Sequence, residues 1–408
     1  MDEISRYAVG LDVGTAHVRA VVASISGGGN LNVIGYAEAP NSGMRRGVVA
    51  NLSGPAQAID RMLGEVERMS GYEVNAATVS INGAAIVSTR TEGMITTGAM
   101  EHEINENDLA RVEDVALQGR IPANQEVLDV VPLQYMLDEQ GGIKDPLGMM
   151  GLRLEMKANV VSTLAPNYEN LRRATEGANV TPQRIVPSVV AAARAVLSER
   201  QKENGVAVVD IGAATTSVAV FEENDLQYIG VVPVGSNNIT NDLAVMLAID
   251  TEVAEEIKRR FATGNFGAVD SPVVIRWRGK EVRFERSQID EVVQARLDEI
   301  LTLVRKELRK AHYEQRLPEG IVLTGGGAKM RELDKFVRET LQTSVKVGVP
   351  TGLNGVAEAV LKPEYATAVG LMLLAAEGGE VKGARKAPKG GTKKEKKPGF
   401  LKKFLGKF

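Results

Sequence analysis

Two short motifs place an aspartate, a glycine and threonine between apolar segments that we expect to be strands. The first is Asp12-Val13-Gly14-Thr15, between residues 7–11 and 18–23; the second is Asp210-Ile211-Gly212-Ala213-Ala214-Thr215-Thr216, between residues 206–209 and 217–221. Glycine allows a tight turn whose N–H groups point at a phosphate. Threonine adds a hydroxyl donor, and aspartate can hold Mg²⁺ through water. A single turn of this kind is usually a plain β-turn, but two copies predict a duplicated hairpin that closes on a polyphosphate.

Two further elements could complete such a site. A predicted strand at 321–323 runs into Gly325-Gly326-Gly327, and we expect a helix to start near Lys329. This turn matches neither the Walker A motif nor the dinucleotide fingerprint, but a glycine turn at a helix start can still hold phosphate. Glu255 and Lys258 lie three residues apart in a predicted helix at 251–261, so they share a face. A plain ion pair on a solvated helix is the simpler interpretation of that pair.

The last ten residues have a different chemistry. Lys382 to Phe408 carries eleven Lys or Arg and one acid, although the net charge of the whole chain is −3. Five large apolar side chains fall on one helical stripe and three lysines lie off it: Phe400, Leu401, Phe404, Leu405, Phe408, and Lys402, Lys403, Lys407. So short a helix is marginal in water, so we expect it to fold reversibly on an anionic membrane. A frayed cationic end is one alternative; nucleic acid would explain the lysines but not the apolar stripe.

Other segments must position these motifs. Ser53-Gly54-Pro55 predicts an N-cap and a helix to about Met69, followed by a strand at 79–82. Residues 84–161 predict a small inserted unit, with a helix at 108–118 behind the caps Asn105 and Asn107 and strands near 127–135 and 152–161. Later we expect a strand pair near 273–277 and 282–284, and helices at 288–310 and 366–376. The Gly-, Lys- and Pro-rich stretch 377–398 predicts a disordered linker.

Composition removes several classes of site. The 408 residues include no cysteine, which excludes disulfides, iron–sulfur clusters and thiol catalysis, and the three histidines are far apart. The N-terminus lacks the pattern of a signal peptide. The apolar run 366–376 is too short to span a bilayer. We therefore expect no membrane-crossing segment.

In this order the four cleft elements resemble the actin/Hsp70/sugar-kinase superfamily, and within it the FtsA family of bacterial cell-division proteins over nearly the full length. The pieces that carry the resemblance are 10–15, 209–216, 235–240 with 242–244, 322–328 and 365–370, together with an insert after Ser80-Ile81-Asn82-Gly83. The resemblance implies an α/β, actin-like (ribonuclease H-like) two-lobed fold with an inserted small α+β subdomain. It also implies ATP with Mg²⁺ in the cleft, with Mg²⁺ held by Asp12 and Asp210. The implied nucleotide-binding residues are Asp12, Gly14, Thr15, Asp210, Gly212, Ala213, Ala214, Thr215, Thr216, Gly235, Asn238, Glu255, Lys258, Gly325, Gly326 and Gly327.

Three departures from the family pattern qualify the site. His17 stands where the family often has lysine, and a neutral imidazole would contact phosphate more weakly. Ala214 stands where glycine is common, so the backbone there should avoid positive φ. The helix after Pro187 contains no Gln or Glu to orient an attacking water. We therefore expect tight nucleotide binding and at most slow ATP hydrolysis.

The resemblance divides the chain into parts with expected roles. The first lobe is 1–83, returning at about 162–190 and 350–376; the second is 191–235, returning at about 311–349; 84–161 is the insert, 236–310 a small partner-binding subdomain, 377–398 the linker and 399–408 the membrane helix. The implied partner is the tubulin-like protein FtsZ, bound through its C-terminal peptide at the small subdomain. Basic residues there are Arg276, Arg278, Arg283, Arg286 and Arg296, although a solvated charged face would explain them equally well.

We further expect self-association into filaments, attachment to the cytoplasmic face of the membrane at the division site, and no nucleic-acid partner; other division proteins could also bind. Two alternatives remain open at this point. One is an actin-fold phosphotransferase, for which no catalytic aspartate motif or sugar pocket is evident. The other is an actin-like adaptor of a pilus or secretion machine, against which the apolar tail counts.

Overall fold

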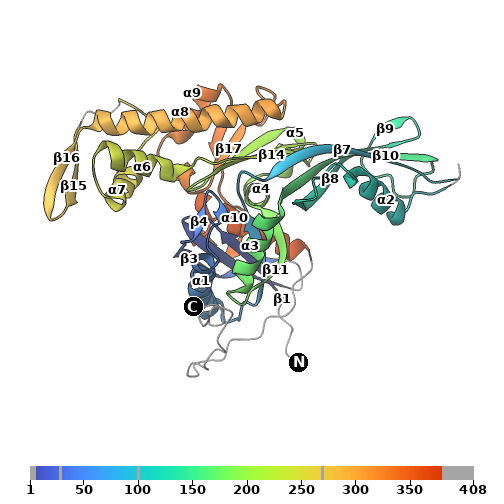
Figure 1. The fold of residues 1–408 in the computed structure, drawn as a ribbon, viewed down its shortest axis with the longest axis horizontal. Coiled ribbons are helices and arrows are strands. Elements are labelled where there is room, and N and C mark those ends of the chain that lie inside the picture. The colour runs from blue at the N-terminus through green and yellow to red at the C-terminus, as the bar shows by residue number, and fades with distance from the viewer. Residues whose placement is uncertain (1–5, 27–29, 99–101, 268–270, 379–408) are drawn as a thin grey trace.

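The structure is a computed structural model that describes residues 6–26, 30–98, 102–267 and 271–378. Two sheets form the two lobes, and helices pack between them and on their outer faces (Figure 1). The tail at 399–408 and nearly all of the linker at 377–398 lie outside the described residues. Within the described part, no helix is both long and apolar enough to cross a membrane.

The first lobe is built on a six-stranded sheet that draws on three separate parts of the chain. Its order is β11-β6-β1-β2-β3-β19, with bounds β1 Arg6–Val13, β2 His17–Ile25, β3 Leu31–Pro40, β6 Ala76–Ile81, β11 Thr181–Pro187 and β19 Asn354–Gly355. Helix α1 (Ser53–Ser70) packs on β2 and β3, and α3 (Ala165–Glu176) packs on β11. A two-stranded ribbon, β4 (Met44–Arg45) and β5 (Val48–Val49), follows β3.

The second lobe repeats the antiparallel opening of the first. Its five-stranded sheet has the order β14-β13-β12-β17-β18, with bounds β12 Val206–Ile211, β13 Thr216–Glu222, β14 Asp225–Val232, β17 Ile321–Thr324 and β18 Val345–Val347. In both lobes the first two strands form a hairpin and the first strand then pairs in parallel with a later one, β6 or β17. Helix α5 (Glu199–Asn204) contacts β13, and α9 (Leu333–Leu341) contacts β18.

Two small-residue helices join the lobes. Helix α10 (Ala366–Glu377) lies on β1, β2 and β6, and α4 (Ser188–Val196) packs against α10 and contacts both β6 and β12. Close approach requires glycine at two positions: a Cβ at Gly370 would lie 1.7 Å from the Ala191 carbonyl oxygen, and one at Gly10 would lie 2.1 Å from that of Ala368. One apolar cluster therefore runs from the first sheet through α4 into the second sheet.

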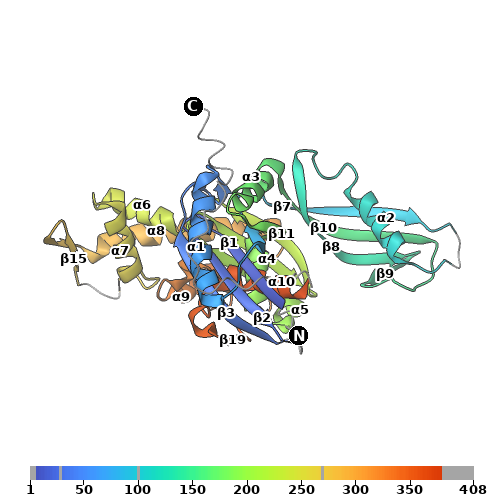
Figure 2. The same cartoon turned by 90° about the horizontal axis from the view of Figure 1, so that it is seen from below.

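Two smaller units lie at opposite ends of the molecule (Figures 1 and 2). The insert is a four-stranded sheet of order β7-β10-β8-β9, formed by β7 (Val87–Thr96), β8 (Gln125–Leu137), β9 (Gln140–Ile143) and β10 (Arg153–Leu164), with α2 (Glu106–Leu117) packed on β7 and β10. The other unit consists of α6 (Ser236–Met246), α7 (Thr251–Phe261), the β15–β16 ribbon (Val273–Trp277 and Lys280–Phe284) and α8 (Arg286–Lys310).

Most expected elements are present with small shifts, and two expectations were wrong. The N-cap of α1 is Leu52 rather than Ser53, whose amide and hydroxyl instead bond to the Asn51 side chain. No α-helix starts near Lys329: residues Gly326–Lys329 form a 3₁₀ turn, and α9 starts at Leu333, after Glu332 at φ 56°. Asn105 does cap α2, through a capping box with Asp108.

Candidate nucleotide-binding cleft

The two D-x-G hairpins have the same turn geometry. The Gly14 N–H donates to the His17 carbonyl oxygen at 3.1 Å, and the Gly212 N–H donates to that of Thr215 at 2.9 Å. In each case a four-residue turn joins strands whose last paired residues are Val13 with Val18 or Ile211 with Thr216. The duplication recognised in the sequence is therefore also a duplication of backbone structure. As expected, Ala214 is not among the described non-glycine residues with positive φ.

The aspartates of the two hairpins are held where their charge is poorly solvated. Asp12 Oδ1 accepts a hydrogen bond from the Ser80 hydroxyl at 2.8 Å, yet burial raises the pKa of Asp12, against the opposing effects of Arg19 and Ser80. Burial, and then the negative charge of Asp12, raise the pKa of Asp210 to about 7, while Arg19 lowers it. Two carboxyl groups thus face one region without a cation to balance both. Carboxylate oxygens such as those of Asp12 and Asp210 are suitable ligands for a hard cation such as Mg²⁺.

The hydroxyl groups near the turns mostly have protein partners. Thr15 Oγ1 accepts from the Gly47 N–H at 3.2 Å, which ties the first hairpin to the β4–β5 ribbon. Thr216 is fully buried and donates to the Val234 carbonyl oxygen at 2.9 Å. Thr215 Oγ1 accepts from the Asn82 side-chain amide at 3.2 Å. In these bonds the Thr15 and Thr215 hydroxyls act as acceptors, so each can still donate to a ligand, whereas the Thr216 hydroxyl is used as a donor within the fold.

The start of α6 lies directly on the second hairpin. The Ser236 and Asn237 N–H groups donate to the Gly212 and Ala213 carbonyl oxygens at 2.9 and 2.7 Å. Gly235 must be glycine, because a Cβ there would lie 2.7 Å from both the Gly212 carbonyl oxygen and the Thr215 nitrogen. The Asn238 side chain caps the helix by accepting from the Gly235 N–H at 3.0 Å. Gly235 and Asn238 therefore position α6 against the phosphate turn.

Glu255 and Lys258 form the expected i,i+3 pair, but the lysine is not solvated. Its Nζ lies 2.5 Å from Glu255 Oε2 and donates to Thr240 Oγ1 at 2.8 Å and to the Ser236 carbonyl oxygen at 3.2 Å. The Lys258 side chain is only 9% exposed, whereas Glu255 is 40% exposed. Burial lowers the pKa of Lys258, and the Glu255 carboxylate opposes that shift. The pair thus joins α7 to α6 and leaves an accessible carboxylate.

His17 faces this same helix from the first lobe. Burial and Arg19 lower the pKa of His17, while Glu38, Arg259 and Glu255 also act on it. Two of these groups, Glu255 and Arg259, are on α7, so the first hairpin lies within electrostatic reach of that helix. The fold brings together elements that are about 240 residues apart in the sequence.

The glycine turn closes the cleft beside the second aspartate. Gly325 has φ 83°, and a Cβ there would lie 2.1 Å from Asp210 Oδ1. A Cβ at Gly327 would lie 2.4 Å from Ile211 Cγ2, so this glycine is also packed on strand β12. Gly326 is exposed and nothing lies within 4 Å of its missing Cβ. Gly326 is therefore the position of the three that leaves room for a flat ligand.

Three contributors to the cleft were not predicted as site residues. Ser80 bonds to Asp12 and to the Val13 N–H, Asn82 bonds to the second hairpin, and Gly47 bonds to Thr15. The segment Ser80–Gly83 supported the family resemblance, but a lone Ser or Asn at a strand end gives no chemical signal of its own. Ser80 and Asn82 reach the hairpins because β6, at whose end they lie, is the parallel neighbour of β1 in the sheet.

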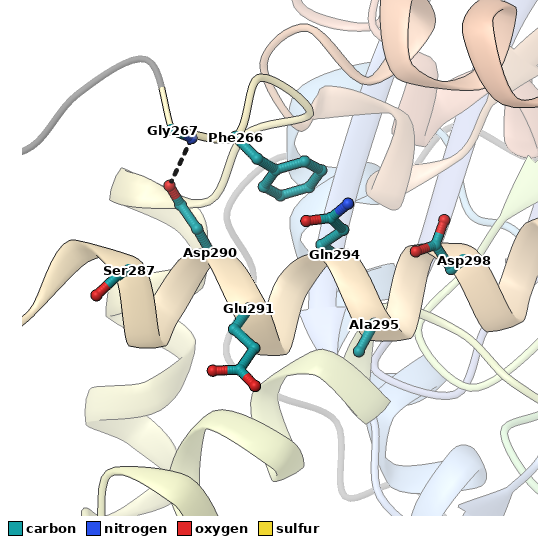
Figure 3. Close-up of a pocket in the computed structure, with 8 residues that line it drawn as sticks. All are labelled: Phe266, Gly267, Ser287, Asp290, Glu291, Gln294, Ala295 and Asp298. Carbon is teal, nitrogen blue, oxygen red and sulfur yellow. Dashed lines mark hydrogen bonds between the residues drawn. The ribbon is translucent and has the colours of Figure 1, made fainter.

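The small subdomain carries a cavity of about 610 Å³ along α8 (Figure 3). Asp290, Gln294 and Asp298 project on the side of α8 that Phe266 faces, whereas Glu291 and Ala295 point the other way. Ser287 and Gly267 also line the cavity. Its lining is acidic with one aromatic ring.

The basic residues expected on this subdomain do not form a free cationic face. Arg286 is buried against Asp290 at 2.8 Å, and Arg296 bonds to Asp242 at 2.7 Å and also to Glu299. Arg278 pairs with Asp250 and lies over the Trp277 ring. Arg276 and Arg283 are exposed on the β15–β16 ribbon. The interspersed acids neutralise most of the positive charge.

Comparison with solved structures gives the class of the fold. The chain superposes on the PilM–PilN type IV pilus biogenesis complex with a TM-score of 0.66 at 20% identity, covering 90% of this chain and 98% of that one. It also superposes on MreB5 of Spiroplasma citri bound to ADP, with a TM-score of 0.52 at 16% identity and coverage of 91% and 96%. The two lobes with paired hairpins are thus an actin-like fold, as the sequence predicted.

The sequence comparisons identify the family. Residues 207–370 match the family model for cell division protein FtsA, and residues 83–162 match the SHS2 domain inserted in FtsA. The chain is 37% identical to FtsA of Pseudomonas aeruginosa, covering 90% of this chain and 88% of that protein. It is 31% identical to FtsA of Bacillus subtilis, with coverage of 92% and 85%. The chain belongs to the FtsA family of cell-division proteins.

Proposed function

We propose that the cleft binds ATP with Mg²⁺, and that this binding controls assembly of a division scaffold. The observation that carries the proposal is the pair of poorly solvated carboxyls, half-buried Asp12 and buried Asp210, which lie directly before the turns of the duplicated hairpins. Two carboxyls with raised pKa values fit a cation that prefers oxygen ligands and retains water. The described residues contain no group of three or more His, Cys, Asp or Glu side chains that could hold a metal by themselves. Magnesium would therefore enter together with the nucleotide phosphates, which supply further oxygens.

Calorimetric titration of the protein with ATP, in the presence and absence of Mg²⁺, tests this proposal. We expect Mg²⁺-dependent binding in the wild type and a large loss of affinity in Asp12→Asn. Asp298→Asn, on α8, is a matched control that should bind as the wild type does. Equal affinity of Asp12→Asn and wild type would refute the proposed site.

Hydrolysis is proposed to be slow. Helix α4 begins at Ser188 directly after β11, and its sequence contains only Ser, Val, Ala and Arg. No carboxylate or amide on α4 is available to orient a water, and general-base catalysis requires such a group within hydrogen-bond reach. A steady-state phosphate-release assay should give turnover far below that of a sugar kinase, with nucleotide acting mainly as a switch.

The small subdomain at 236–310 is proposed to dock the C-terminal peptide of FtsZ. Asp298 and Phe266 lie on the same side of the cavity beside α8, whereas Asp290 is already paired with Arg286. We therefore propose that the peptide places a basic side chain near Asp298 and an apolar one near the ring. Fluorescence anisotropy with a labelled peptide tests this. Asp298→Lys should weaken binding, whereas Glu65→Lys, the same change of two charge units at an exposed position on α1, should not. Equal weakening by both would show a nonspecific charge effect.

Residues 399–408 are proposed to attach the scaffold to the cytoplasmic face of the membrane. Full burial of a large apolar side chain is worth about 1.5–3 kcal/mol, and each lysine near an anionic surface adds about 1 kcal/mol. Five such side chains and three lysines suffice for reversible binding, which self-association into filaments would strengthen. Vesicles with and without anionic lipid should separate the two contributions. Replacing Phe404 and Leu405 by Glu should abolish pelleting with vesicles, and unchanged pelleting would refute the anchor.

Membership of the FtsA family favours this division scaffold over the phosphotransferase and the pilus adaptor. The fold alone would not separate them, since the pilus protein above has the same fold at 20% identity.

A further inference from the structure

The insert leaves the first lobe but rests on the second. The insert begins after β6 and ends with β10, which leads into α3. Both β6 and α3 belong to the first lobe. Its strands β7, β8 and β10 nevertheless contact β14, the edge strand of the second-lobe sheet, and Figure 1 draws β7 beside β14. The insert is therefore bonded covalently to the first lobe, packs on its α3 and β11, and also packs on the second lobe.

The contact with β14 is made by side chains that reach its main chain. Arg90 Nη2 donates to both the carbonyl oxygen and the side-chain oxygen of Gln227 at 2.9 Å. The Asn159 amide donates to the Leu226 carbonyl oxygen at 2.8 Å, and Ser88 Oγ accepts from the Ile229 N–H at 3.2 Å. Because these hydrogen bonds end on the backbone of β14, they fix the position of the insert along that strand.

This junction is buried in its centre. Asn159 is 0% exposed and its side-chain oxygen accepts from Ser88 at 2.8 Å, so both ends of its amide have partners. Val161 of the insert, at the end of β10, belongs to the same apolar cluster as Leu226 and Ile229 of β14. Buried and satisfied polar groups of this kind fix one arrangement, because any displacement leaves a donor or acceptor without a partner. At the rim, Lys144 adds ion pairs to Asp225 at 2.7 Å and Glu223 at 2.8 Å.

The other end of the insert touches the second phosphate hairpin. Asn82, the last residue before the glycine that leads into the insert, donates to Thr215 Oγ1 and accepts from Ser217 Oγ, both at 3.2 Å. Its side-chain oxygen also accepts from the Gly83 N–H at 2.7 Å. The connector is thus bonded to the turn on which the second lobe would hold phosphate.

These contacts close a ring. The second hairpin continues as β13, which pairs with β14, and β14 is hydrogen-bonded to the insert. The insert is joined to Asn82 of the first lobe, whose side chain is hydrogen-bonded to Thr215 of the second hairpin. We infer that the insert acts as an interlobe brace, which ties β14 and the second hairpin to the first lobe and restrains opening of the cleft. Because opening must precede release of a bound polyphosphate, the brace slows the exchange of a nucleoside triphosphate; this second statement rests on the proposed function.

The test uses the full chain with the brace weakened. Arg90→Ala removes the bonds to Gln227, and Arg90→Ala with Asn159→Ala also removes the bond to Leu226. Arg153→Ala is the matched control, since Arg153 is an exposed residue at the start of β10 that pairs with Glu155 at 2.8 Å within the insert. Circular dichroism and melting establish which variants are folded. If the double variant does not fold, Arg90→Ala alone decides the outcome.

The first measurement does not involve nucleotide. The chain has no cysteine, so Glu65→Cys on α1 and Glu339→Cys on α9, both exposed, give one spin label on each lobe. We expect the distance distribution between the labels to broaden in the brace variants and to stay narrow in the control. An unchanged distribution in folded brace variants overturns the inference.

The second measurement is the rate at which a fluorescent ATP analogue dissociates. Loss of the Arg90 and Asn159 bonds should accelerate dissociation by about tenfold, the factor expected when one or two net hydrogen bonds are lost from the closed state. An unchanged rate in folded variants that bind the analogue also overturns the inference. If the wild type binds no analogue, the proposed function fails, and the brace is then judged on the label distances alone.

Discussion

Replacing Asp210 with Asn should make the nucleotide-free protein more stable while impairing Mg²⁺–ATP binding. The folded state raises the pKa of Asp210 from 3.8 to about 7, a difference of about three units. At 1.36 kcal/mol per unit, the ionised carboxylate costs the folded state at most about 4 kcal/mol. Because two aspartates share the region and water can enter the cleft, we expect a measured gain of a few kcal/mol.

The sign follows from linkage. A group with a raised folded-state pKa contributes stability that is present below pH 3.8 and is lost as the pH rises through about 7. The wild type should therefore lose this contribution between pH 4 and pH 8, and Asp210→Asn should not. Urea unfolding with EDTA and without nucleotide, at pH 5 and pH 8, measures the difference. Asp298→Asn on the α8 surface controls for a general loss of negative charge.

A difference between Asp210→Asn and wild type that is the same at pH 5 and pH 8 would refute the reasoning. It would mean that Asp210 is solvated, or is already balanced by a cation such as Arg19, in the folded protein. Addition of Mg²⁺ and ATP should reverse the order and stabilise the wild type more than the variant. A site that costs stability when empty is the usual signature of a binding site rather than of a structural one.

Three further substitutions, two of them compared with a glycine control, test the packing around the aspartates and between the helices. Gly325→Ala should lower the free energy of unfolding by about 1–3 kcal/mol, because φ is positive and a carboxylate oxygen lies 2.1 Å from the new Cβ; Gly326→Ala, with open space around it, should be near neutral in urea unfolding. Gly370→Ala should lower the free energy of unfolding by at least about 3 kcal/mol, because the new Cβ forces α4 and α10 apart. Gly64→Ala, in the open middle of α1, should instead raise it by about 0.5–1 kcal/mol. Equal melting temperatures of the two variants would contradict the tight contact between α4 and α10. Lys258→Ala should lower the free energy of unfolding by about 1–3 kcal/mol, because the Ser236 carbonyl oxygen and Thr240 Oγ1 lose the lysine as a donor. A loss below about 0.5 kcal/mol would mean that Lys258 and Glu255 behave as a surface ion pair.

Local patterns were sufficient for the hairpins and several helices. Strands β1 and β12 follow from apolar runs that end at an aspartate and a glycine, and α7 and β15 match the expected bounds because their apolar periodicity is clear. The sequence-based predictions were wrong where contacts with distant residues determine the local backbone structure. The segment after the glycine turn contains good helix formers, but packing of Gly327 on Ile211 and hydrogen bonding of Gly325 to Pro363 hold it as a 3₁₀ turn.

The site shows the same division between local and distant information. Asp12, Asp210 and the glycines could be chosen from motif and resemblance, and the fold places Asp210 near Asp12 and next to Gly325; their binding of nucleotide stays a prediction. Ser80 and Asn82 could not be chosen, because their roles depend on β6 lying beside β1 and on the second hairpin lying close to the connector. The arginines of the small subdomain looked like a cationic face because acids that neutralise them, Asp242 and Asp250, are distant along the chain.

Helix α10 makes completion of the first lobe wait for a distant part of the chain, since β2 ends at Ile25 and α10 starts at Ala366. Strands β1 and β2 need α10 to cover Ala8, Val21 and Ala23, which share an apolar cluster with it, and α10 ends at Glu377. Ribosomes deliver the N-terminal strands first. These strands therefore stay uncovered while the chain between Ile25 and Ala366 is being made. The nascent first lobe therefore exposes apolar surface that the finished protein buries under α10.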